Sequence, residues 1–216
     1  MKKTLLILAA ATVLSAPFTG CEEEDSVTSP VESGIDWPDR TEAEDCVAIM
    51  EMVFRHGNID KYRDLLLRPD TSGVFPQGYI WFNQVEDITG GEVEDLYLNC
   101  DQDIAATDSI LSNSDSLYLD IFTADWDSLE IFRGKPCSDC WKTIRSYHLF
   151  WRMDSGRNYF CYFYLKLIIG PDPDEDNKYQ IYEAFDLQEP FVSGRCKLPE
   201  NSEYTSLGEL KDYFLR

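Results

Sequence analysis

The sequence predicts an α+β domain in which N-terminal helices pack on a long, curved antiparallel sheet. Apolar residues recur at helical spacing between residues 41 and 66. In three later segments, 143–153, 159–169 and 178–188, they occupy alternate positions over ten or so residues. Helices followed by a run of strands are typical of the α+β class. A lipocalin-like or other closed β-sheet is the alternative architecture.

The segment before the domain has the features of an export signal. Two lysines, a short apolar run and small residues precede Cys21, and the run is too short to span a bilayer. The sequence Phe-Thr-Gly-Cys at 18–21 resembles a bacterial lipobox, in which the cysteine is acylated and becomes the first mature residue. We therefore interpret 1–20 as a lipoprotein signal peptide and Cys21 as the lipidation site. An ordinary signal peptide followed by an unrelated cysteine is the alternative.

The mature chain is predicted to be an acidic tether, 21–40, followed by a single domain, 41–216. Seven acids, one base and two prolines lie between Glu22 and Arg40, with little apolar surface to bury. Cleavage before Cys21 removes Lys2 and Lys3 and so takes the net charge from −21 to −23. Such a charge excludes nucleic acid as a partner. A lipid anchor would hold the protein on the cell envelope, either periplasmic or surface-exposed.

The first predicted helix is the best-specified element of the domain. Thr41 and Glu44 form a T-x-x-E capping box, and Gly57 supplies the stop. Asn58 then caps a shorter helix that ends before Pro69. A third helix is predicted over 93–104. The apolar face of the first helix consists of Ala43, Cys46, Val47, Met50, Val53 and Phe54.

The predicted strands follow the helices. Shorter strands are expected in 73–82, where Pro76 interrupts the pattern, and at 117–121, 129–131 and 192–198. In the three long strands one face is apolar and is expected to meet the helices. The other is aromatic, with Phe160, Tyr162 and Tyr164, which is typical of a partner surface. At the C-terminus, a capping box of Ser206 and Glu209 predicts a short closing helix that docks through Leu207, Leu210 and Phe214.

This order of elements resembles the nuclear-transport-factor-2-like superfamily, a cone of helices held in a curved sheet. The resemblance rests on the first helix, the connection GNIDKYRDLL at 57–66 and the three long strands after Thr143. The end, SLGELKDYF, is also similar to a terminal signature of uncharacterised lipoproteins with that fold, although Leu207 stands where a Trp is expected. The resemblance implies a cone-shaped pocket and frequent dimerisation, here as a homodimer through the aromatic sheet face.

Some members of the superfamily are isomerases and dehydratases that work inside the cone, which directs attention to two residues. Such a site needs a base with a raised pKa and a donor to the developing oxyanion. Glu183 is predicted on the apolar face beside Ile181 and Phe185, and His148 lies in the middle of a strand. An unpaired carboxylate is costly there. The structural alternatives are an arginine partner for Glu183, such as Arg145 or Arg152, or a kink that turns Glu183 outward.

The segment DPDEDNKYQIYE at 172–183 raises the question of calcium binding. Asp172, Asp174, Asp176 and Glu183 fall at positions 1, 3, 5 and 12 of an EF-hand pattern. Asn177 replaces the glycine at position 6, and strands flank the segment instead of helices. The main interpretation is an acidic hairpin turn in solvent, with calcium as the alternative.

Six cysteines remain after Cys21. Their even number in an exported protein permits up to three disulfides. The candidates are Cys137, Cys140, Cys100 and Cys196, whereas Cys46 and Cys161 lie on apolar faces and are interpreted as core thiols. The C-x-x-C pair at 137–140 favours a structural disulfide, either within the pair or to other cysteines, because the strand that follows and the neighbouring Asp139 do not suit a redox thiol. Redox activity and metal binding by this pair are the alternatives.

The sequence therefore predicts a lipid-anchored envelope protein that acts as a non-catalytic module for binding a small molecule or a protein, without a cofactor. A small isomerase-like or dehydratase-like enzyme and a calcium-binding envelope protein are the alternatives. The sequence contains no G-x-S-x-G, no H-E-x-x-H and no phosphate-binding glycine loop.

Overall fold

The computed structural model describes residues 34–69, 77–83, 95–153, 156–187 and 202–215. The chain divides into two units, Met1–Asp36 and Trp37–Arg216, and every described helix and strand lies in the second. The predicted signal peptide 1–20, the lipidation site Cys21 and most of the tether 21–40 therefore lie outside the described residues. So do the strand at 192–198 and parts of the strand at 73–82 and of the helix at 93–104. None of the described helices is long and apolar enough to cross a membrane.

The first helix begins one residue later than the capping prediction. Glu42 is the N-cap, and its side chain and that of Asp45 form the capping box, with Glu42 N donating to Asp45 Oδ2 at 3.1 Å. Glu44 is thereby released and binds Arg145 on a distant strand. Gly57 ends the helix in the left-handed conformation, as predicted. The described helices are α1 (Ala43–His56), α2 (Ile59–Leu65), α4 (Cys100–Ser112) and α5 (Leu207–Leu215).

The third helix is shifted relative to the sequence prediction over 93–104. Residues 97–99 form a strand, and α4 begins at Cys100 because Asn99 and Gln102 form a capping box. The side chain of Asn99 accepts from Gln102 N at 3.0 Å, and the side chain of Gln102 accepts from Asn99 N at 3.0 Å. This later start places Asp103 on the buried face of α4.

An eight-stranded sheet forms the rest of the domain. Its central path runs β2-β1-β7-β6-β5-β3, while β4 extends the edge of β5 and β8 extends the edge of β6. The described strands are β1 (Ile80–Phe82), β2 (Tyr97–Asn99), β3 (Ser114–Ile121), β4 (Asp127–Phe132), β5 (Lys135–Met153), β6 (Asn158–Pro171), β7 (Tyr179–Leu187) and β8 (Ser202–Tyr204).

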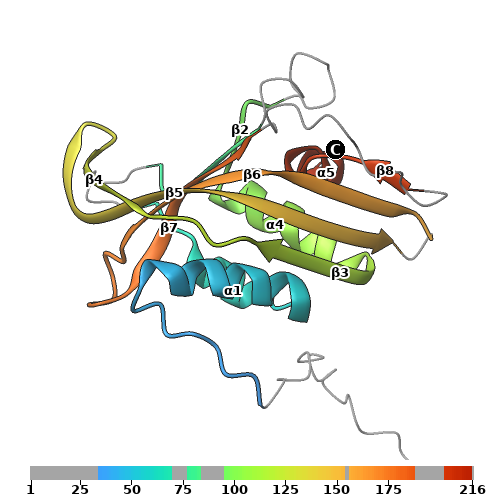
Figure 1. Ribbon diagram of the computed structural model, residues 1–216, viewed down its shortest axis with the longest axis horizontal. Coiled ribbons are helices and arrows are strands. Elements are labelled where there is room, and N and C mark those ends of the chain that lie inside the picture. The colour runs from blue at the N-terminus through green and yellow to red at the C-terminus, as the bar shows by residue number, and fades with distance from the viewer. Residues whose placement is uncertain (1–33, 70–76, 84–94, 154–155, 188–201, 216) are drawn as a thin grey trace, which may run out of the picture. The chain divides into compact units, whose positions relative to one another are not determined.

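The three long strands form an antiparallel sheet, as predicted, and two short strands that pair in parallel make the whole sheet mixed. The long strands β5, β6 and β7 are antiparallel to one another, but β1 runs parallel to β7 and β8 runs parallel to β6. Figure 1 shows α4 and α5 behind the long strands β5 and β6, with β4 at the left. The α+β class, with helices packed in a curved sheet in the cone arrangement expected from the resemblance, is confirmed.

The two faces of the sheet differ as the alternation predicts. The inner face, which packs against the helices, carries buried side chains of the three long strands: Arg145, Tyr147, Leu149, Trp151, Cys161, Leu165, Leu167, Ile169, Ile181, Ala184 and Asp186. The outer face is the opposite side of β3, β5, β6 and β7. Its aromatic, aliphatic and weakly basic residues include Tyr118, Ile144, His148, Phe150, Phe160, Tyr164, Lys166 and Phe185.

A β-bulge in β7 breaks the predicted alternation. Ile169 pairs with Ile181 and Ile168 pairs with Glu183, so Tyr182 is an extra residue on β7. The side chains beyond the bulge therefore change face. Glu183 and Phe185 share a face, but it is the outer face and not the apolar face that meets the helices, which corrects the prediction of an inward Glu183. Ile181 lies on the inner face.

Candidate functional site

Glu183 is held by an arginine that the sequence analysis did not single out. Arg133 Nε donates to Glu183 Oε1 at 2.8 Å, and Arg133 Nη1 donates to the carbonyl oxygen of Gly78 at 3.0 Å. Arg133 lies in the tight turn between β4 and β5 and has a left-handed backbone with φ of 48°. The carboxylate of Glu183 therefore joins this turn to β7, whereas the expected partners Arg145 and Arg152 bind Glu44 and Asp115.

His148 lies on the outer face, far from Glu183. It is exposed, and its ring packs edge-on against Phe122 with centroids 4.8 Å apart. Glu183 lies in the row of the sheet that contains Lys142, and Lys142 and His148 are six positions apart in β5. At about 3.3 Å per residue, this places the two candidates about 20 Å apart along the strands. The structure does not bring them together into one site.

The acidic turn between β6 and β7 is tied to the start of the domain. Asp172 Oδ1 accepts from the backbone of Asp174 at 2.9 Å, and Asp172 Oδ2 accepts from Arg40 Nη1 at 2.9 Å. Arg40 Nη2 also donates to Glu175 at 2.7 Å. Asp176 is exposed in the same turn, while Glu183 faces Arg133. Among the described residues, no group of three or more His, Cys, Asp or Glu side chains is placed to hold a metal ion.

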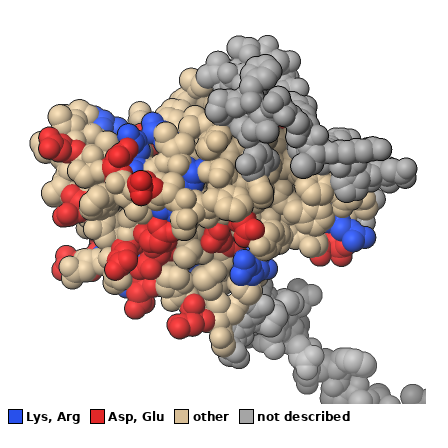
Figure 2. Space-filling model, in the orientation of Figure 1, with Lys and Arg blue, Asp and Glu red and all other residues tan. Residues whose placement is uncertain are grey.

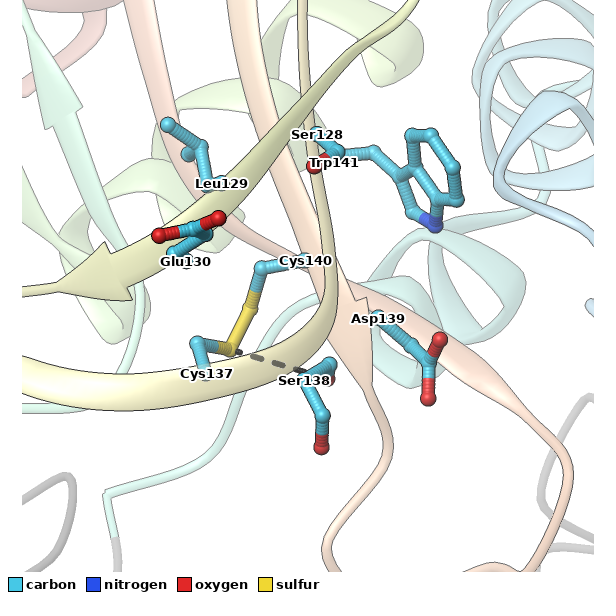
Figure 3. Close-up of a pocket in the computed structure, with 8 residues that line it drawn as sticks. All are labelled: Ser128, Leu129, Glu130, Cys137, Ser138, Asp139, Cys140 and Trp141. Atoms are coloured by element: carbon cyan, nitrogen blue, oxygen red, sulfur yellow. Dashed lines mark hydrogen bonds between the residues drawn. A yellow bond between two sulfur atoms is a disulfide. The ribbon is translucent and has the colours of Figure 1, made fainter.

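The C-x-x-C pair forms the predicted disulfide between Cys137 and Cys140. In the register of β4 and β5, Leu129 pairs with Cys140 and Ile131 pairs with Pro136. One residue of β4 therefore lies opposite three residues of β5, and the disulfide closes a bulge at Ser138 and Asp139. Figure 3 shows this disulfide in a surface pocket lined by residues of the β4–β5 hairpin, with the Trp141 ring pointing away from it. Cys100, a disulfide candidate, is a buried free thiol, and Cys196 lies outside the described residues.

The remaining cysteines behave as core residues. Cys46 and Cys161 are buried and take no part in the described disulfide, as predicted. Burial raises the pKa of Cys46 to about 12 and that of Cys100 to about 11, so both stay protonated at neutral pH. Thiolate chemistry at these two positions is therefore disfavoured.

The most unusual polar residues lie in the interior, between the helices and the inner face of the sheet. Lys211 of α5 forms an ion pair with Asp103 of α4, and both side chains are fully buried. Tyr62 of α2 donates its hydroxyl hydrogen to Asp103 Oδ2 at 2.6 Å and accepts from Lys211 Nζ at 3.3 Å. The Lys211 ammonium also lies 3.5 Å from the centroid of the Trp81 ring. We call Lys211, Asp103, Tyr62 and Trp81 the Lys211 cluster.

A second buried carboxylate holds the first turn of the same helix. Asp186 of β7 accepts from Gly208 N at 2.8 Å and from the Tyr147 hydroxyl at 2.9 Å. Leu207 N donates to the Tyr147 oxygen at 3.4 Å. The predicted capping box is present at the start of α5, where Glu209 N donates to Ser206 Oγ at 2.9 Å and Ser206 N donates to Glu209 at 2.8 Å.

Burial controls the protonation of these groups. It lowers the pKa of Lys211, although the Asp103 carboxylate opposes the shift. Burial, with nearby carboxylates, raises the pKa of Tyr62 and of Tyr147 well above the usual value. The two phenols therefore remain hydrogen-bond donors to Asp103 and Asp186 at neutral pH. The described contacts hold and neutralise charge, and they leave neither carboxylate without a donor.

The sequence analysis missed the Lys211 cluster, although a signal for it exists. Lys211 follows Leu207 by four residues and precedes Phe214 by three, which places a lysine on the apolar face of an amphipathic helix. Asp103 follows Cys100 by three residues in α4. Two opposite charges on the buried faces of two helices indicate an internal ion pair, but the sequence does not say that these helices meet.

No family model and no curated protein matches this sequence. Solved structures with a similar fold include a candidate dehydratase of the NTF2-like family from Streptomyces avermitilis, which is 10% identical and covers 67% of this chain and 92% of its own, with a TM-score of 0.49. An NTF2-like superfamily protein from Salmonella enterica is 7% identical, covers 69% and 89%, and has a TM-score of 0.46. A candidate aromatic ring hydroxylase from Novosphingobium aromaticivorans is 9% identical, covers 73% and 93%, and has a TM-score of 0.48. These similarities concern the fold alone, so function is argued from the residues of this chain.

Proposed function

We propose that this protein is a non-catalytic interaction module, tethered to the bacterial cell envelope through a lipidated Cys21, that pairs with a second copy of itself through the outer face of its sheet. The observation that carries the proposal is an apolar and aromatic surface on a chain whose net charge is −21. Large exposed apolar patches on soluble domains mark interaction sites.

The outer face offers rigid rings across adjacent strands. Tyr118 is 42% exposed and Ile144 is 49% exposed. The rings of Phe150 and Phe160 pack at 5.1 Å across β5 and β6, and Lys166 Nζ lies 4.0 Å from the centroid of the Phe185 ring. Side chains fixed by such contacts lose little conformational entropy on binding, which favours association.

Charge selects a second copy as the occupant of this face. The strands that carry this face contain five described acids: Asp115, Asp120, Asp139, Glu183 and Asp186. Asp115 is paired with Arg152 and Glu183 with Arg133, and Asp186 lies on the inner face. In Figure 2 the surface over β5 and β6 is largely uncharged, whereas acidic residues gather over α1 and the β4–β5 hairpin. Two copies that meet outer face to outer face keep their acidic surfaces apart, whereas other arrangements bring like charges together.

The interior supports a non-catalytic role. Glu183 is paired with Arg133, and His148 lies on the other side of the sheet from the helices. Asp103 and Asp186 are each neutralised or hydrogen-bonded by α5. A general base needs a free carboxylate or imidazole within reach of a substrate, and these carboxylates are already engaged.

The homodimer is tested by a charge placed in the middle of the outer face. We expect the Cys21→Ser chain to sediment as a dimer at about 100 μM and Ile144→Asp in the same background to sediment as a monomer. The carboxylate of each copy would lose its hydration in the interface, which is costly even beside Lys166 on the neighbouring strand. The matched control is Ile131→Asp, since Ile131 is 63% exposed on the hairpin outside this face. A monomeric parent chain, or equal dissociation of both variants, would contradict the proposal.

The anchor is tested on protein from its native host. We expect the intact mass of the mature chain to equal that of residues 21–216 plus an acylated glyceryl group on Cys21, and we expect Cys21→Ala to move the protein from the membrane fraction to the soluble fraction. One acyl chain holds a protein only marginally and two hold it stably. A free Cys21 thiol in the membrane-bound protein would refute lipidation.

A further inference from the structure

The Lys211 cluster is more than hydrophobic packing requires. A lysine of zero exposure has lost its hydration, and apolar side chains of similar size commonly give equal or greater stability at such positions. The fold therefore does not need an ammonium group in its interior. The interior nevertheless supplies a set of groups that can bind an ammonium group.

The groups around the Lys211 nitrogen are those with which proteins hold ammonium ligands. Trp81 presents the face of its ring at 3.5 Å, Asp103 supplies the counter-charge, and Tyr62 supplies an acceptor oxygen at 3.3 Å. An aromatic face attracts a cation through its quadrupole, most strongly with Trp and when water is excluded. Together the three groups form a site that recognises the end of a primary alkylammonium.

The walls of this site belong to elements other than α5. Tyr62 lies on α2, Trp81 on β1 and Asp103 on α4. The Tyr62 hydroxyl bonds Asp103 at 2.6 Å, and Trp81 Nε1 donates to Asn83 Oδ1 at 2.9 Å. None of these contacts involves α5. The cage is therefore held in place without the helix that fills it.

The helix itself depends on its docking. α5 has nine residues, and a helix of this length is marginal in water on its own. It is fixed by Lys211 in the cage, by Gly208 N on Asp186 and by apolar contacts such as the Trp151–Phe214 ring pair at 5.5 Å. A competitor for the cage thus acts against one of the main contacts of α5.

We propose that the Lys211 cluster is a binding site for a primary alkylammonium, which α5 fills with its own lysine and which a free alkylamine occupies in its place. The site is separate from the outer face, so it stands or falls independently of the proposed homodimer. The ligand class is a linear primary amine with a short apolar stem, because the group that fills the site is a fully buried lysine side chain, an unbranched chain that ends in a primary ammonium beside the buried Trp81.

The first arm of the test removes the internal ammonium. Lys211→Ala lacks the atoms of n-propylammonium, so this amine at pH 7 should bind the variant saturably and raise its melting temperature by about 5 °C or more. Neither sodium chloride at the same ionic strength nor 1-propanol should raise the melting temperature of this variant. The double variant Lys211→Ala/Asp103→Asn should not be stabilised by n-propylammonium, because it lacks the counter-charge. The control variant Lys178→Ala, which removes a lysine at the surface, should not be stabilised either.

The second arm uses the unaltered domain in the Cys21→Ser chain. Saturating n-butylammonium should speed hydrogen exchange of the amides of α5 at least tenfold and leave those of α1 unchanged. Lys211→Ala that folds only with the amine also supports the proposal. Lys211→Ala that does not respond to the amine, or that stays unfolded with it, overturns it. Rescue without faster exchange of α5 also overturns it, because Lys211 would then be a permanent part of the core.

Discussion

Replacing Asp103 with alanine is expected to lower the free energy of unfolding by about 3–5 kcal/mol. The change leaves the Lys211 ammonium fully buried, with the Tyr62 oxygen and the Trp81 ring in contact and Asp186 as the remaining carboxylate that acts on its charge. An unpaired charge in the interior costs far more than a lost surface ion pair, because neither water nor a counter-ion replaces the missing carboxylate. Urea unfolding at pH 7 measures the loss as a lower midpoint with an unchanged slope.

Two further variants separate the ion pair from simple packing. Asp103→Leu/Lys211→Met should recover most of the stability, since apolar pairs of similar volume commonly replace buried ion pairs without loss. Asp115→Ala should cost less than about 1 kcal/mol, because its ion pair with Arg152 is exposed, with side-chain exposures of 56% and 54%. A loss below 1 kcal/mol for Asp103→Ala would show that Lys211 reaches water or a second anion.

The cap of α1 shows how local sequence rules reach their limit. Two overlapping signals, T-x-x-E at Thr41 and E-x-x-D at Glu42, are both present, and the structure uses the second. The reason is tertiary: Arg145 is 1% exposed on the inner face and takes both oxygens of Glu44, at 2.8 and 2.6 Å. Periodicity predicts that a helix begins here. A buried arginine a hundred residues away decides which acid caps it.

The candidate site was less predictable than the fold for a related reason. The alternation of apolar residues predicted β5 and β6 and their two faces, because period two follows from strand geometry alone. In β7 a single extra residue, Tyr182, moves the side chains that follow it to the other face of the sheet. No local signal in the sequence predicts this bulge. The Lys211 cluster requires α2, α4, α5 and β1 to meet, which depends on topology and not on any one segment.

The stability of the domain is expected to fall steeply above about pH 10.5. Tyr62, Tyr79 and Tyr147 are fully buried, and burial raises the pKa of each hydroxyl well above its usual value. In the unfolded chain tyrosine loses its proton near pH 10. Above that pH the folded state holds more protons than the unfolded state, so the free energy of unfolding decreases as pH rises. Each tyrosine contributes about 1.4 kcal/mol per pH unit, and the three together about 4 kcal/mol.

Lys211 changes the free energy of unfolding in the opposite direction to the tyrosines, and it does so over a different pH range. Its pKa is lowered in the folded state, so raising the pH towards about 10.4, where an unfolded lysine also loses its proton, increases stability and then adds nothing. Above about pH 10.5 Lys211 therefore adds nothing to the slope. Urea unfolding between pH 10.5 and 11.5 should reveal the three tyrosines together with Cys46 and Tyr182, because burial raises the pKa of each of these two groups to about 12. Tyr147→Phe should reduce the slope by about one proton, whereas Tyr213→Phe, at a residue that is 65% exposed, should leave it unchanged. Tyrosinate absorbance that develops fully in the folded protein would contradict the burial of these hydroxyls.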